Sequence, residues 1–148
     1  MTAFLMLALI SPPVEIQTVP EQPVLSLSNP RLHALRLKVT NRSNNELQIW
    51  MTDTWINHKL QLTRLDGATA TMTKKGLSDD QLFGSLRRDM NFPIVLKPER
   101  SLTYMTEDIV QDFELSPGKY RFMVTYSDKS SGKPLQVTSR GITLTVIK

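Results

Sequence analysis

The chain has 148 residues, of which 40% are hydrophobic and 22% charged, and this balance fits one globular domain and excludes a disordered chain. It contains no cysteine, which excludes disulfides, thiolate metal sites and a cysteine nucleophile. The formal net charge is +4, but the basic residues are spread along the chain without interleaved aromatics, so we expect no nucleic-acid partner.

The N-terminal part of the chain is apolar and then rich in proline. Residues 3–10 are an unbroken apolar run, too short to span a bilayer but long enough for a signal peptide. No Lys or Arg precedes this run and no clear cleavage site follows it. Three interpretations therefore stay open: a signal peptide with a missing or misassigned start, an export segment of unusual form, or a buried first strand. Residues 12–23, with four prolines, predict an extended linker.

This interpretation divides the chain into a segment at residues 1–23 and a domain at residues 24–148. In the domain, alternating apolar and polar residues predict short strands. The alternation is clearest in four segments: 35–39, 47–51, 120–126 and 142–146. Weaker patterns predict strands in four more: 59–65, 68–73, 93–96 and 101–106. About seven or eight short strands without long crossover helices predict an all-β, antiparallel sandwich.

The alternation stops between residues 73 and 93. Ser78 followed by Gln81 matches a capping box, and acids at the start with arginines at the end suit the helix dipole, so a short helix is predicted at residues 79–88. Such an insertion could cover an open end of the core or form a partner-binding loop. The exposed cations of that loop would be Lys74, Lys75, Arg87 and Arg88.

Two tryptophans and a histidine bracket the loop after the strand at residues 47–51, and residues 52–57 are the predicted ligand-facing loop. Trp50 lies on the polar side of its strand's alternation. It could be an exposed platform for a sugar or peptide, or it could pack under the 73–93 insertion. Trp55 and His58 complete this candidate ligand-binding group.

No set of residues predicts catalysis or a metal site. His33 and His58 lack metal-site spacing, and the chain has no Gly-x-Ser-x-Gly elbow and no glycine-rich phosphate loop. Acids cluster at residues 107–114, but core-type residues interrupt them, which favours a turn with acids facing water over a calcium loop. Asn41 begins a formal glycosylation sequon, relevant only in a eukaryotic secretory pathway. We expect no enzymatic activity, no metal and no cofactor.

The clearest turn signal of the chain is the Leu-x-Pro-Gly-x-Tyr element formed by Leu115, Pro117, Gly118 and Tyr120. It resembles the bend before strand F of immunoglobulin-like and fibronectin-type domains, where a tyrosine hydroxyl bonds to upstream backbone. The resemblance implies this structural role for Tyr120.

The wider layout is similar to a group of bacterial sandwich domains. Its shared features are a strand ending in Asn-x-Ser, at Asn41 and Ser43, and a Leu-x-Pro turn, at Leu96 and Pro98. The Bacillus-type intracellular proteinase inhibitor domain and the N-terminal sandwich domains of some secreted metalloproteases have this layout. The resemblance covers residues 32–148 and implies an immunoglobulin-like sandwich, here without the immunoglobulin disulfide.

The sequence therefore predicts a non-catalytic, extracytoplasmic bacterial module that binds another protein or has a structural accessory role, with no stable membrane span. One alternative is a protease inhibitor that presents a loop from residues 73–93, which follows from the resemblance in layout alone. The other is a carbohydrate-binding module that uses Trp50 and Trp55.

Overall fold

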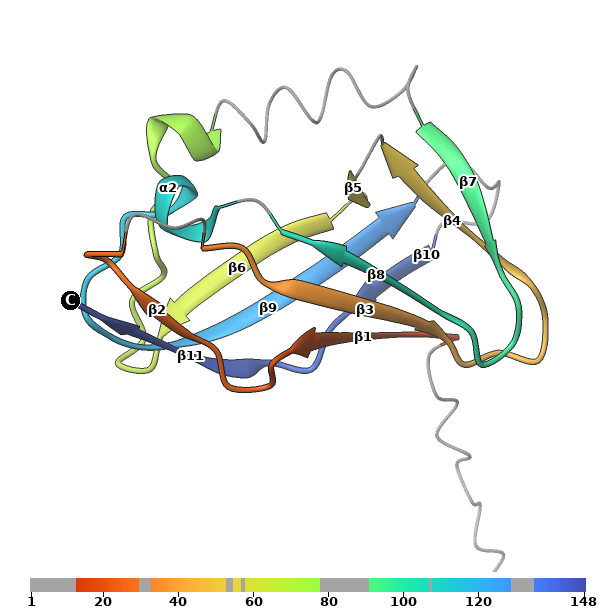
Figure 1. The fold of residues 1–148 in the computed structure, drawn as a ribbon, viewed down its shortest axis with the longest axis horizontal. Coiled ribbons are helices and arrows are strands. Elements are labelled where there is room, and N and C mark those ends of the chain that lie inside the picture. The colour runs from red at the N-terminus through yellow and green to blue at the C-terminus, as the bar shows by residue number, and fades with distance from the viewer. Residues whose placement is uncertain are drawn as a thin grey trace, which may run out of the picture.

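The computed structural model of the protein describes residues 13–29, 33–52, 55–56, 58–77, 91–106, 108–128 and 135–148. These residues form an all-β sandwich, as the alternation predicts, and it is immunoglobulin-like, as the resemblance implies (Figure 1). Its strands are β1 (Val14–Val19), β2 (Val24–Ser26), β3 (Arg36–Asn41), β4 (Leu47–Thr52), β5 (Trp55–Ile56), β6 (His58–Arg64), β7 (Asn91–Leu96), β8 (Ser101–Met105), β9 (Gly118–Asp128), β10 (Leu135–Thr138) and β11 (Ile142–Ile147). A short helix, α2 (Ile109–Asp112), follows β8.

The strands form two main sheets and a smaller third sheet. The first sheet has the order β1-β3-β8, and the third has the order β5-β4-β7. In the second sheet the long strand β9 pairs with β6 on one edge, and with β10 and β11 in succession on the other; β2 lies beyond β11. The core lies between the first and second sheets, where the alternating apolar side chains of β3 and β9 are buried. On β9 these are Tyr120, Phe122, Val124 and Tyr126, all at most 2% exposed.

Several predicted elements need correction. The strand predicted at residues 59–65 is β6, but residues 68–73 form only isolated bridges, Thr63 with Thr69 and Met72 with Phe113. Residues 74–77 form one helical turn. The predicted helix at residues 79–88 lies outside the described residues, as does the apolar run at 3–10.

The segment 12–23 is not a linker, because it contains β1. Val14 and Ile16 are buried in the core, and β1 pairs antiparallel with β3 from Val14 opposite Asn41 to Val19 opposite Arg36. The chain then crosses to the second sheet, where β2 runs parallel to β11. The boundary predicted at residue 24 therefore falls between two strands of the sandwich. Prolines 13 and 20 flank β1 without interrupting it, which is where strands tolerate proline.

A β-bulge separates β10 from β11 along β9. Thr138 lies opposite Thr125 and Ile142 lies opposite Phe122, so three residues of one strand face two of the other. Ser139 fills the interruption: its N–H donates to the Val124 carbonyl at 2.7 Å, and its hydroxyl accepts the Val124 N–H at 2.9 Å. The bulge is therefore fully hydrogen-bonded at its buried position.

Two chain segments turn a corner together between the first and third sheets. β3 continues into β4, β7 continues into β8, and the two segments pair on both sides of the corner. Asn41 stands at this corner with an exposed fraction of 0%. Its backbone N–H donates to the Arg100 carbonyl at 3.0 Å, and its carbonyl accepts the Glu99 N–H at 2.9 Å.

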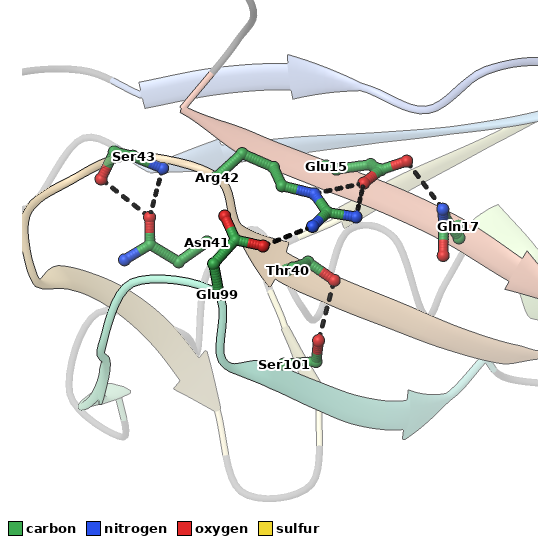
Figure 2. Close-up of polar contacts among 8 residues, drawn as sticks. All are labelled: Glu15, Gln17, Thr40, Asn41, Arg42, Ser43, Glu99 and Ser101. Atoms are coloured by element: carbon green, nitrogen blue, oxygen red, sulfur yellow. Dashed lines mark hydrogen bonds and ion pairs between the residues drawn. The ribbon is translucent and has the colours of Figure 1, made fainter.

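The Asn41 side chain bonds to the turns on both sides of the corner. Its Nδ2 donates to the carbonyls of Asn45 and Leu96, each at 2.8 Å. Its Oδ1 accepts the backbone N–H and the hydroxyl of Ser43, both at 2.8 Å (Figure 2). Four hydrogen bonds saturate this amide. In this buried, fully bonded position the nitrogen is not available for the glycosylation that the sequon formally allows.

We expect Asn41→Leu to lower the free energy of unfolding by about 2–4 kcal/mol, because it leaves carbonyls and an N–H at the corner without partners. Urea denaturation measures the change. The matched control is Asn44→Ala in the same turn, where the side chain is exposed and the expected change is within about 0.5 kcal/mol. Equal effects of the two substitutions would contradict the structural role of Asn41.

Tyr120 makes the hydrogen bond to upstream backbone that the resemblance implies. Its hydroxyl donates to the Ser116 carbonyl at 2.9 Å and accepts the Ser116 N–H at 3.1 Å. The Arg64 guanidinium lies 5.7 Å from the ring centroid. Gly118 begins β9 with a φ of 155°, which other residues rarely adopt, and a Cβ there would approach the Arg64 side chain at 3.1 Å.

Tyr120→Phe should lower the free energy of unfolding by about 1 kcal/mol, because the ring still fills its place in the core while two hydrogen bonds are lost. Thermal and urea denaturation both measure this loss. An unchanged stability would show that the hydroxyl does not hold this corner.

Candidate functional site

The structure places the tryptophans on paired strands. Trp50 lies in β4 and Trp55 in β5, and Thr52 pairs with Trp55. In the predicted ligand-facing loop at residues 52–57, Thr52 and residues 55–56 therefore belong to a short antiparallel pair, and residues 53, 54 and 57 lie outside the described residues. The side chains of both tryptophans lie outside the described part of the structure.

His58, which borders the predicted ligand-facing loop, is the first residue of β6. Its side chain is 9% exposed, and its ring centroid lies 5.6 Å from that of Tyr104 in β8. The aromatic contact joins the two main sheets. This burial separates His58 from the exposed candidate residues.

The two described candidate lysines lie on the helical turn at residues 74–77. Lys74 is exposed, whereas Lys75 Nζ lies 3.1 Å from Asp112 Oδ1 in an ion pair. Arg87 and Arg88 lie outside the described residues. The turn packs closely on α2, since a Cβ at Gly76 would meet the Asp112 carbonyl.

The expectation that the acids near α2 face water is wrong for Asp108 and Asp112, which are 7% and 5% exposed. Asp108 caps α2, where its Oδ1 accepts the Val110 N–H at 3.1 Å. Asp112 pairs with Lys75. Over the described ranges no group of three or more His, Cys, Asp or Glu side chains has the arrangement of a metal site.

A groove of about 530 Å³ runs along β1, between this strand and the bulged connection from β10 to β11. Figure 1 shows β1 beside the segment that leads from β10 into β11. The groove is lined by Val14, Glu15, Ile16, Gln17, Thr18, Glu21, Gln22 and residues 138–143. It therefore brings together an edge of each main sheet.

The backbone of β1 is unpaired on the side away from β3. Among the described residues β1 pairs only with β3. The Arg42 N–H donates to the Pro13 carbonyl at 2.8 Å, and hydrogen-bonding direction alternates along an antiparallel strand. Residues 13, 15, 17 and 19 therefore bond toward β3. The N–H and carbonyl groups of Val14, Ile16 and Thr18 point to the free edge.

Thr18 is the most unusual residue of the groove wall. It is 3% exposed, and its hydroxyl has no hydrogen-bond partner within the described structure. Thr40 has the same exposed fraction, but its hydroxyl lies 2.9 Å from that of Ser101. A buried hydroxyl without a partner costs free energy that a partner group could recover.

The groove has an acidic outer rim. Arg42 forms ion pairs with both Glu15 and Glu99. Its guanidinium lies 2.7 Å from Glu15 Oε2 and 2.6 Å from Glu99 Oε2 (Figure 2). The hydrogen bond from Arg42 holds the pKa of the Glu15 carboxyl below its ordinary value, so this carboxylate stays ionised at neutral pH. Glu21 adds a second exposed acid to the lining, and Arg140 adds one base.

Comparisons with known proteins place the chain in no family. No family model and no curated protein matches the sequence. One similar solved structure is the crystal structure of AggA, the major subunit of aggregative adherence fimbriae type I from Escherichia coli. The identity is 18%, the match covers 90% of this chain and 94% of that chain, and the TM-score is 0.40. At this TM-score neither a family nor a function is carried over, and the resemblance to proteinase inhibitors has no support from these comparisons.

The sequence interpretation missed the groove because it assigned residues 12–23 to a linker. The signal was present in the alternation of Val14, Ile16 and Thr18 with Glu15 and Gln17, which is the same pattern that identified the other strands. No helix among the described residues is long and apolar enough to span a membrane.

Thr18→Val should raise the free energy of unfolding by on the order of 1 kcal/mol, because it removes a buried hydroxyl that lacks a partner while keeping the volume. Thr40→Val should lower it by about 1 kcal/mol, because that hydroxyl is bonded. Urea denaturation of the isolated protein measures both. If Thr18→Val destabilises as much as Thr40→Val, the Thr18 hydroxyl already has a partner in the free protein.

Proposed function

We propose that the chain is a non-catalytic, extracytoplasmic module that binds another protein by adding an extended segment of that partner to the free edge of β1. The observation that carries this proposal is the unpaired edge of β1 beside a groove lined by Thr18, whose buried hydroxyl has no partner among the described residues. Strand addition to an exposed sheet edge is a recurring mode of peptide recognition. The apolar run at residues 3–10 supports the extracytoplasmic location.

The length of the free edge sets the length of the bound segment. Pro13 and Pro20 lie just outside β1, and proline has no N–H to donate. The edge therefore offers the backbone groups of Val14, Ile16 and Thr18, which match a segment of about five or six residues at the rise of a β-strand. Main-chain hydrogen bonds would supply affinity, and the groove walls would select alternate side chains.

The charges at the groove favour a basic partner segment. Glu15 and Glu21 lie in the lining, against the single base Arg140. A Lys or Arg on the outer face of the bound segment would lie near these carboxylates. Because they are exposed, they would contribute more to partner choice than to affinity.

The two alternative functions have less support. An inhibitory loop at residues 73–93 and a sugar platform at Trp50 and Trp55 both depend on side chains outside the described structure. No described contact favours either one over strand addition.

The proposal is tested with random peptides displayed on phage, selected against the full chain, followed by amide hydrogen exchange with a selected peptide. We expect slower exchange for the amides of Val14, Ile16 and Thr18 in the complex, because these N–H groups would become hydrogen-bonded. The amides of residues 15 and 17 already bond to β3 and should change little. Protection confined to another edge, or no selectable peptide, would refute the proposal.

A matched pair of proline variants provides a second test. Thr18→Pro removes an N–H that points into the groove, and should weaken peptide binding by about tenfold or more. Thr103→Pro removes an equivalent outward N–H on β8, at the opposite edge of the same sheet, and should change binding by less than about twofold. Equal losses would show that β1 is not the binding edge. Melting temperatures of both variants check the fold, and the exchange experiment on the unaltered chain does not depend on them.

A further inference from the structure

The solvent-facing side of the second sheet contains no acidic residue among the described positions. β2, β6, β10 and β11 have no Asp or Glu, and β9 has only its last residue, Asp128. The outward positions are Val24, Ser26, Lys59, Gln61, Thr63, Lys119, Arg121, Met123, Thr125, Ser127, Gln136, Thr138, Thr143, Thr145 and Ile147. The exposed aliphatic side chains Val24 and Ile147 lie at its β2 edge. We name this surface the threonine–cation face.

The strand registers bring hydroxyls and cations into rows across the sheet. Arg121 lies between Thr63 of β6 and Thr143 of β11. In a second row, Thr125 lies between Lys59 of β6 and Thr138 of β10. Each cation therefore has threonine hydroxyls directly beside it on neighbouring strands.

The three cations of this face are free to bind an anion. Lys59, Lys119 and Arg121 are exposed, and none has an ion pair with a described residue. Lys119 and Arg121 are two residues apart on β9, about 7 Å at the rise of a strand, and Lys59 lies opposite Thr125, about 13 Å further along. Gly141 in the bulge leaves room for the Arg121 side chain, since a Cβ there would lie 2.5 Å from Arg121 Nε.

The neutral groups on this face indicate a sugar polymer in preference to a protein. Threonine hydroxyls both donate and accept hydrogen bonds, as sugar hydroxyls do, and Thr125 and Thr138 already show such a contact at 3.0 Å. The centres of protein interfaces are instead depleted in charge and enriched in aromatic residues. None of the described outward positions of this face is aromatic.

We propose that the threonine–cation face binds an acidic polysaccharide, with Lys59, Lys119 and Arg121 facing its carboxylate or sulfate groups and the threonines bonding to its hydroxyls. This site borders the β1 groove at Thr138 and Thr143, its three cations lie outside the groove lining, and it uses neither tryptophan. Binding should weaken as salt concentration rises, because exposed charges are screened over about 10 Å at 0.1 M salt.

The test measures binding of the full chain to polygalacturonate by isothermal titration calorimetry, with neutral dextran and poly-L-glutamate as comparison polymers. We expect binding to polygalacturonate, none to dextran, and affinity for poly-L-glutamate lower by about tenfold or more, because it lacks hydroxyls. Equal affinity for poly-L-glutamate would indicate that the face binds an acidic protein and not a polysaccharide. No binding to polygalacturonate would overturn the proposal.

Charge-matched variants locate the site. The triple variant Lys59→Gln, Lys119→Gln and Arg121→Gln should lose about tenfold or more in affinity. The control, Arg36→Gln, Lys38→Gln and Arg100→Gln, makes the same charge change on and beside the first sheet and should lose less than about twofold. Equal losses would show that net charge alone attracts the polymer.

A charge-neutral variant tests the hydroxyls separately. Thr63 and Thr143 lie on the two sides of Arg121, and the double variant Thr63→Val with Thr143→Val removes both hydroxyls without altering any charge. It should weaken polygalacturonate binding by about threefold or more, while leaving the weak binding of poly-L-glutamate unchanged. Unchanged affinity for polygalacturonate would contradict a role for the threonines in sugar recognition.

Discussion

The hydrogen bonds of Asn41 are the constraint on which the rest of the sandwich depends. This residue ends β3, and its side chain ties together the two turns at which the β3–β4 and β7–β8 segments leave the first sheet. Its complete burial means that water cannot replace a lost partner. The corner sets where β3 and β8 begin their pairing, and β3 in turn holds β1 in register. The groove along β1 is thus built on a polar contact at the end of a neighbouring strand.

The two proposed binding surfaces differ because they use different parts of a sheet. The β1 edge offers backbone groups, which recognise the extended form of a chain, while the groove beside it would select the side chains. The threonine–cation face offers only side chains, since its backbone groups are used between strands. The two surfaces meet at Thr138 and Thr143, which line the groove and also belong to the threonine–cation face.

Alternation predicted the strands of the core because burial of every second side chain is a local consequence of the pleat. At β1 the same alternation was present, but prolines at both ends suggested a linker. At residues 68–73 a strand was predicted, but only isolated bridges form. Buried Asp108, Asp112 and His58 could not be recognised, because their partners are distant in the sequence or belong to a helix cap. The groove depends on how two sheet edges meet, and no local pattern specifies that.

The bulge at Ser139 shifts the alternation of buried and exposed residues by one position between β10 and β11. In β10 the odd-numbered Val137 is buried, whereas in β11 the even-numbered Leu144 and Val146 are. Losing or gaining one residue there would turn every side chain of one strand to the wrong face. Natural variants of this protein should therefore keep the length of the chain between β10 and β11 constant.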